Sequence, residues 1–79
     1  MKRIKQTEQK EIGRIKLGDT QDLVVSIVDN EKVDLRIFLN TDSYKGPTKR
    51  GVRFYMFDDN WPEFMKLMEK VDRKYQELT

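Results

Sequence analysis

The chain has 79 residues, of which 37% are hydrophobic and 38% charged, and its formal net charge at pH 7 is +2. It contains neither cysteine nor histidine, which excludes disulfides, thiolate or imidazole catalysis and the common zinc ligand sets. A chain this short predicts a single domain. Such a domain buries only about 60–65% of the surface that its unfolded chain exposes, so it is expected to be marginally stable unless it self-associates.

Three further expectations follow from composition. Without reactive side chains of the usual kinds, the protein is predicted not to be an enzyme and to need no cofactor, metal or small-molecule substrate. Its uncharged runs are far shorter than the ~20 residues that span a bilayer, so no membrane partner is expected. No apolar stretch follows the basic N-terminus, which predicts a cytoplasmic protein, nucleoid-associated if bacterial.

Basic residues are concentrated in two blocks. Residues 1–16 carry six basic and two acidic side chains, residues 17–42 carry two basic and six acidic ones, and residues 43–57 carry four basic and no acidic ones. The last block also contains the aromatic residues Tyr44, Phe54, Tyr55 and Phe57. Cations beside flat rings suit a polyanion whose bases need stacking partners. A solvated strand face would explain the same block.

Hydrophobic periodicity predicts the first elements in chain order. Residues 1–10 are almost wholly polar and are expected to form a flexible basic N-terminal tail. Alternation predicts a strand over residues 11–17. A run rich in β-branched residues predicts a second strand over 23–28, and period-two alternation over 33–39 predicts a third that forms a hairpin with the second.

The second half of the chain predicts a loop, a strand and a helix. The loop is expected over residues 40–50 and the fourth strand over 51–57. Asn60 is expected to cap the helix, with Glu63 completing a capping box, and apolar residues then follow a 3.6-residue period for nearly 19 residues. Residues 11–79 are therefore predicted to form an α+β domain, in which a four-stranded antiparallel curved sheet is followed by one long C-terminal helix on one of its faces.

The apolar stripe of this helix is wider than one small sheet requires. We expect one flank to pack on the sheet and the other on the helix of a second copy, because a closed two-fold contact is the commonest way to cover such a surface. The alternative is that the whole stripe packs on its own sheet. The predicted dimerisation residues of this homodimer are Phe64, Leu67, Met68, Val71 and Tyr75.

The sheet face away from the helix is then either solvated or a binding surface. Arginine and lysine bind phosphates, and flat rings stack on unpaired bases for ~1–3 kcal/mol per base. The single predicted helix is charge-balanced and is expected to pack on the sheet, so no helix is available for the major groove of a duplex. Single-stranded nucleic acid is therefore favoured over duplex. The candidate residues on this face are Arg14, Lys16, Arg36, Phe38, Arg53 and Tyr55, and the acid-free block adds Lys45, Lys49 and Arg50.

Four segments of the chain together carry a resemblance. They are, in order, Ile12-Gly13-Arg14, Val33-Asp34-Leu35-Arg36-Ile37-Phe38, Gly46-Pro47-Thr48-Lys49-Arg50-Gly51-Val52, and Trp61 at the start of the helix. This order and spacing resemble the positive-cofactor-four transcriptional coactivator family, most closely its compact bacterial-type members. The resemblance implies a β-β-β-β-α subunit that dimerises through its helix and holds single-stranded DNA in a channel with little sequence preference.

The resemblance also implies roles for individual residues. Arg36 corresponds to a strand arginine that contacts the DNA backbone, Lys49 and Arg50 to a basic segment, and Lys32 to a lysine of the hairpin. Family members carry an aromatic residue in the first hairpin loop, where this chain has Asn30 and Glu31. Base stacking is therefore expected from Phe38, Tyr44 or Tyr55.

The sequence thus predicts a non-catalytic, homodimeric single-stranded DNA-binding protein of the transcriptional-coactivator type. One alternative is a binder of single-stranded RNA, because the sequence does not distinguish the two sugars. Another is a protein-interaction or regulatory subunit whose basic loop docks on an acidic partner. The adjacent carboxylates Asp58 and Asp59 are interpreted as a helix start rather than as a metal site.

Overall fold

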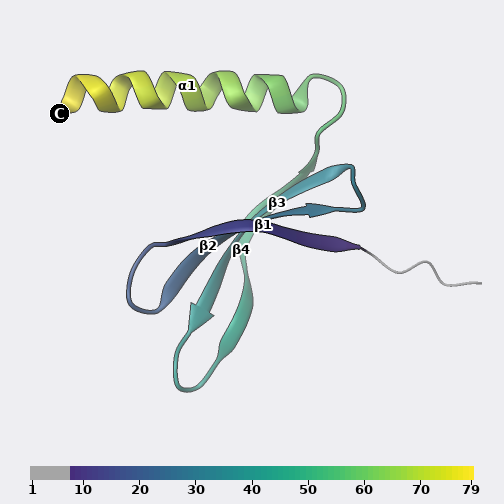
Figure 1. Ribbon diagram of the computed structural model, residues 1–79, viewed down its shortest axis with the longest axis vertical. Helices are drawn as coiled ribbons and strands as arrows, with labels where there is room; N and C mark the ends of the chain where they lie inside the picture. The colour runs from purple at the N-terminus through teal and green to yellow at the C-terminus, as the bar shows by residue number, and fades with distance from the viewer. Residues whose placement is uncertain (1–7) are drawn as a thin grey trace, which may run out of the picture.

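The computed structural model describes residues 8–79, and most of the predicted N-terminal tail lies outside these described residues. Figure 1 shows four strands and one helix: β1 (Gln9–Lys16), β2 (Gln21–Val28), β3 (Lys32–Asn40), β4 (Lys45–Tyr55) and α1 (Asn60–Leu78). The strands form one antiparallel sheet in the order β1-β2-β3-β4. The predicted α+β class and the succession of four strands and a terminal helix are confirmed.

The hairpin of β2 and β3 is the most regular part of the sheet. Its register runs without interruption from the pair Gln21 and Leu39 to the pair Val28 and Lys32. The connecting turn places both Asp29 and Asn30 at positive φ, 55° and 57°, the backbone that a tight hairpin turn requires and that Asp and Asn tolerate better than most residues.

Strand β4 begins at Lys45, so the prediction of a loop over residues 40–50 was wrong for most of that segment. The sequence Gly46-Pro47 indicates a turn, but proline is compatible with an edge strand, where its missing N–H breaks no ladder bond. An irregularity follows, because the three residues of β3 from Arg36 to Phe38 lie opposite the five residues of β4 from Gly51 to Pro47. The extra residues form a bulge that bends the edge of the sheet.

The register divides the sheet into two faces, because residues paired directly across strands point to the same side. One face, here called the polar face, carries the even-numbered side chains of β2 and β3, from Asp22 to Val28 and from Lys32 to Asn40. The opposite face, here called the apolar face, carries Leu23, Val25, Ile27, Val33, Leu35, Ile37 and Leu39.

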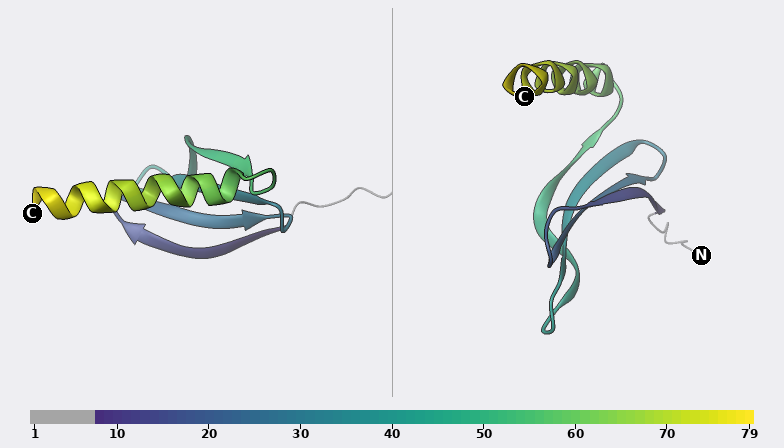
Figure 2. Two further views of the ribbon diagram at one scale, coloured as in Figure 1. Left: turned by 90° about the horizontal axis from the view of Figure 1, so that it is seen from above. Right: turned by 60° about the vertical axis from the view of Figure 1, so that its left-hand side comes forward.

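The buried side chains lie mainly on the polar face. Val24, Ser26, Val28 and Asp34 are each at most 2% exposed, although they stand on the face with the charged residues. The strongly bent sheet in Figure 2 accounts for this, because its curvature brings the outer strands around the centre of that face. On the apolar face only Val33 is buried, and its other aliphatic side chains on β2 and β3 stay partly exposed.

Helix α1 spans Asn60–Leu78, as predicted, but within residues 8–79 it contacts only one strand, β4. The contact is an aromatic cluster in which the ring of Phe64 lies 5.5 Å from that of Phe54 and 5.6 Å from that of Trp61. None of the helix residues is buried, and Figure 1 and the right-hand view of Figure 2 show the helix running clear of the strands. The expectation that the helix covers a face of its own sheet therefore holds only at its first turns.

The helix start also differs from the predicted capping box. The N-cap is Asp59, at φ 67°, and its side chain makes no capping hydrogen bond. Asn60 instead donates from Nδ2 to the carbonyl oxygen of Tyr55, 2.8 Å away. Its amide therefore ties the helix start to the end of β4.

Candidate nucleic-acid interface

Eight of the ten predicted DNA-binding residues share the polar face. On β1 and β2 the register pairs Lys16 with Asp22 and Arg14 with Val24. On β3 and β4 it pairs Lys32 with Tyr55, Asp34 with Arg53 and Asn40 with Lys45. The polar face therefore brings together Arg14, Lys16, Lys32, Arg36, Phe38, Lys45, Arg53 and Tyr55.

The other two predicted residues, Lys49 and Arg50, are exposed and lie in the bulged segment of β4. This segment is held to β3 by Thr48, whose hydroxyl donates to the carbonyl oxygen of Ile37 at 2.7 Å and accepts from the backbone N–H of Arg50 at 3.1 Å. The Thr48 side chain thus replaces ladder bonds that the bulge interrupts.

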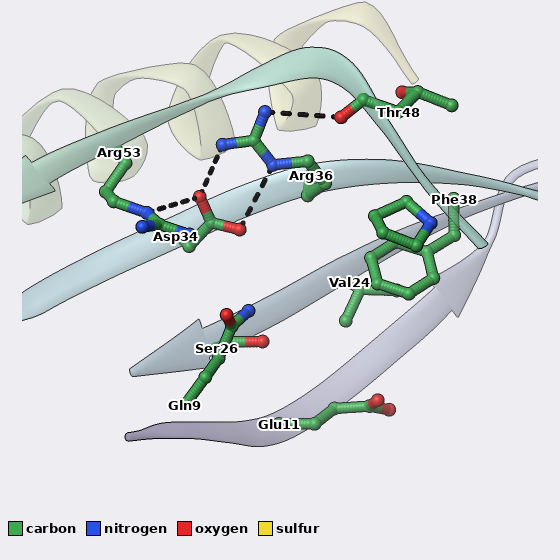
Figure 3. A pocket seen from close by; sticks show the side chains of 10 residues that line it. Gln9, Glu11, Val24, Ser26, Asp34, Arg36, Phe38, Thr48 and Arg53 are labelled. Carbon is green, nitrogen blue, oxygen red and sulfur yellow. Dashed lines mark hydrogen bonds and ion pairs between the residues drawn. The ribbon is translucent and has the colours of Figure 1, made fainter. Parts of the chain in front are cut away.

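Arg36 is anchored by a buried carboxylate. Its Nη2 and Nε donate to Asp34 at 2.6 and 3.2 Å, and its Nη1 donates to the carbonyl oxygen of Thr48 at 3.4 Å. Arg53 donates from Nε to the same carboxylate at 3.2 Å. Figure 3 shows Asp34 between the two guanidinium groups. Two arginines on one acid leave a net positive charge at this point.

The pairing has electrostatic consequences for both partners. Hydrogen bonding from Arg36 lowers the pKa of the Asp34 carboxyl below its usual value, against the opposing effect of burial and with further help from Arg53. The same hydrogen bond raises the pKa of Arg36. Asp34 and Arg36 therefore stay ionised at neutral pH. The Arg36 side chain is 19% exposed and that of Arg53 is 40% exposed.

Gly51 allows the Arg36 side chain to lie against β4. A Cβ atom at Gly51 would stand 2.3 Å from the carbonyl oxygen of Leu35 and 3.2 Å from Cζ of Arg36. Both distances are shorter than ordinary van der Waals contact, so β3 and β4 approach here only because the residue has no side chain.

Two ring contacts lie towards opposite ends of the polar face. The Arg14 guanidinium lies over the ring of Phe38, 5.4 Å from its centroid. At the other end the Lys32 ammonium lies 5.0 Å from the centroid of the Tyr55 ring, which stacks on Phe57. Each pair places a cation beside a flat surface, the combination that suits a phosphate next to a base.

A bulge in β1 brings an acid onto the same face. The register shifts between Glu11 and Gly13, and an extra residue reverses the alternation of a strand. Glu11 and Arg14 therefore point to the same side, and the arginine donates to the carboxylate at 2.7 and 2.8 Å and to Asp22 at 3.1 Å. The hydrogen bonds of Arg14 lower the pKa of Glu11.

The centre of the polar face is a hollow of about 470 Å³ to which all four strands contribute (Figure 3). Its β3–β4 side has the cations Arg36 and Arg53, and Phe38 provides a ring. The β1–β2 side is polar without being basic. The lining residues are Gln9, Glu11, Val24, Ser26, Asp34, Arg36, Phe38, Pro47, Thr48 and Arg53.

Several of these residues were absent from the sequence-based site. Asp34 and Glu11 are acidic, and a search for cations and rings passes over them. Asp34 could have been found as the residue two positions before Arg36, on the same side of a predicted strand. Glu11 could not have been found in this way, because the face on which it lies depends on a bulge that the sequence does not predict.

No protein-family model, curated protein or solved structure matches this chain. Within residues 8–79, no helix combines the length and the apolar character needed to cross a membrane. In the same part of the chain, no group of three or more carboxylates is arranged to hold a metal ion.

Proposed function

We propose that this protein binds single-stranded DNA through its polar face, with little sequence preference, as a homodimer of the transcriptional-coactivator type. The observation that carries the proposal is the shared placement of eight predicted contact residues on one hollowed sheet face. Such a face offers phosphates a cationic side and offers bases aromatic platforms, which is how sequence-tolerant single-strand binding is achieved.

The charge distribution supports a path for the phosphates along β3 and β4. On these strands the polar face carries four cations, Lys32, Arg36, Lys45 and Arg53, against the single acid Asp34. The bulged segment adds Lys49 and Arg50 beside them. On β1 and β2, by contrast, Arg14 is shared between Glu11 and Asp22, so this side attracts a polyanion less strongly.

The shape of the face favours a single strand over a duplex. Its floor is concave and partly buried, and its rings Phe38 and Tyr55 lie within the sheet face rather than on a projecting helix. Stacking needs bases that are unpaired and can be splayed out. A duplex would offer only its phosphates, because its bases are already stacked and paired.

Anisotropy of fluorescent oligothymidine, compared with a matched duplex and an RNA at two or more salt concentrations, tests the proposal. With about 4–6 phosphates neutralised, the affinity for the single strand should fall with a log–log salt slope near −3 to −4. Lys49→Glu should weaken binding severalfold, whereas Lys70→Glu, the same charge change on α1, should have a much smaller effect.

Equal affinity for duplex and single strand, or a flat salt response, would contradict this function. Tighter binding of RNA than of DNA would favour the single-stranded RNA alternative. The remaining alternative is a protein-interaction subunit that docks on an acidic partner through Lys49 and Arg50. In that case oligothymidine should not displace the partner.

A further inference from the structure

The β1–β2 side of the hollow has a chemistry that phosphate binding and stacking leave unused. Glu11 faces the hollow beside its cross-strand partner Ser26, which is 2% exposed, and Gln9 lies two residues before Glu11 on β1. These side chains are an ionised carboxylate, a hydroxyl and an amide. The carboxylate repels a phosphate, and all three side chains form directional hydrogen bonds.

The lining contains the three kinds of group that a nucleotide contacts, namely cations, a ring and side chains that form hydrogen bonds. Arg36 and Arg53 stand on the β3–β4 side, Phe38 provides a ring, and Gln9 and Glu11 stand on β1 (Figure 3). Because β1 lies across the hollow from the arginines, a nucleotide with its phosphate at the arginines can direct the hydrogen-bonding edge of its base towards β1.

Glu11 is held in place by Arg14. The guanidinium donates to both carboxylate oxygens, at 2.7 and 2.8 Å, and also bonds Asp22 and lies over the ring of Phe38. Arg14 itself does not line the hollow. It therefore orients the carboxylate, while each carboxylate oxygen keeps a further lone-pair direction for another donor.

We propose that Glu11 reads the base edge in this hollow and gives the protein a preference for guanine within single-stranded DNA. The inference rests on the proposed function and adds base selection to it. A carboxylate only accepts hydrogen bonds, and guanine presents two adjacent donors, N1–H and the N2 amino group. Adenine and cytosine present one donor beside an acceptor, and thymine presents one donor between two carbonyl oxygens, which a carboxylate repels.

The preference should be modest. A bidentate contact to a base is worth about 1–3 kcal/mol in a well-enclosed site. The side chain of Glu11 is 43% exposed, so water screens part of that gain. We therefore expect about a three- to tenfold preference for a guanine-containing strand, which is at the low end of what an enclosed contact would give.

The test measures the affinity of the full chain for three 12-mers in lithium chloride, which suppresses guanine quadruplexes. The probes are oligothymidine, alternating thymidine and deoxyguanosine, and alternating thymidine and deoxyinosine. Inosine keeps N1–H and lacks the N2 amino group. The guanine strand should bind tightest, the inosine strand should be intermediate, and Glu11→Gln should reduce the guanine preference to less than twofold.

Glu69→Gln is the matched control, because it removes the same charge from an exposed position on α1. It should keep the full preference, and thermal unfolding should show that both variants fold. Equal affinity of the wild type for the three strands, or a guanine preference that survives Glu11→Gln, would overturn this inference. Salt-dependent binding of oligothymidine would meanwhile leave the proposed function standing, and its absence would remove both proposals.

Discussion

A single buried carboxylate organises the basic side of the polar face at the scale of individual residues. Asp34 is 1% exposed and accepts hydrogen bonds from both Arg36 and Arg53. An arginine held at two nitrogens loses little further conformational freedom when it binds a phosphate, because its rotamer is already restricted. Asp34 therefore acts as a positioning residue for two predicted DNA contacts.

The stability of the protein should depend on pH through Asp34. Its pKa in the folded state is lowered by Arg36, so the unfolded chain takes up the proton first as the pH falls. The contribution of Asp34 is fully present above the unfolded pKa of about 3.9. It is lost as the pH falls through the lower folded value. Urea unfolding measured from pH 7 to pH 2.5 should therefore show a midpoint concentration of urea that decreases as the pH falls below about 3.9.

Asp34→Asn should remove much of that dependence and lower the stability at pH 7 by about 1–3 kcal/mol, because the arginine donors lose an ionised acceptor. Asp72→Asn, on the exposed surface of α1, should keep the wild-type profile. A profile of Asp34→Asn parallel to that of the wild type would contradict the assignment. If this variant does not fold, an NMR titration of the wild-type Asp34 carboxyl measures the lowered pKa directly.

At the scale of elements, the close approach of β3 to β4 depends on Gly51. Gly51→Ala should destabilise the protein by about 1–3 kcal/mol, because its Cβ would stand 2.3 Å from the carbonyl oxygen of Leu35, a backbone atom that cannot rotate out of the way. Gly13→Ala is the control, since nothing lies within 4 Å of a Cβ there, and it should change the stability by less than about 1 kcal/mol. Chemical denaturation measures both, and equal effects would contradict the role given to Gly51.

The same elements show what the sequence could and could not predict. Strand β2 follows from its β-branched residues, and β3 and the span of α1 follow from periodicity; the structure has all three within about two residues. The start of β4 was missed because Gly46-Pro47 indicates a turn, whereas Thr48 holds this segment to β3 with its side chain. That bond depends on register, which composition does not encode.

The residues of the candidate site could likewise be predicted only in part. The residues of β3 and of the later part of β4 could be assigned to one face, because alternation alone places Arg36 beside Phe38 and Arg53 beside Tyr55 on the same side. The bulge in β1 reverses that alternation, so the presence of Glu11 on the polar face could be seen only in three dimensions. A bulge adds one residue and leaves no periodic signal.

At the scale of the whole molecule, residues 8–79 leave two of their own apolar surfaces exposed. The aliphatic side chains of the apolar face are partly exposed, and the predicted seam of α1 is more open still, with Leu67 55%, Met68 41%, Val71 59% and Tyr75 59% exposed. Phe64 packs against Phe54 and is the one predicted dimerisation residue that the described residues leave only partly exposed. Monomeric proteins rarely leave contiguous apolar patches of this kind in water.

A second copy would cover these surfaces symmetrically, and the proposed dimer predicts a solution mass of twice 9.5 kDa. Val71→Glu should shift the protein towards monomer, because it places a carboxylate in the middle of the seam. Gln76→Glu makes the same charge change about 140° around the helix axis from Val71, outside the seam, and should leave the mass unchanged. Light scattering after size-exclusion chromatography distinguishes the two.

The dimer also bears on binding, because two polar faces held together engage one longer strand with a raised effective concentration. Val71→Glu should therefore weaken the affinity for a long oligothymidine at least tenfold, yet change that for a strand short enough to occupy one polar face much less. A wild type that is monomeric at tens of micromolar would refute the dimer. A monomeric variant with undiminished affinity for the long strand would show instead that each polar face acts alone.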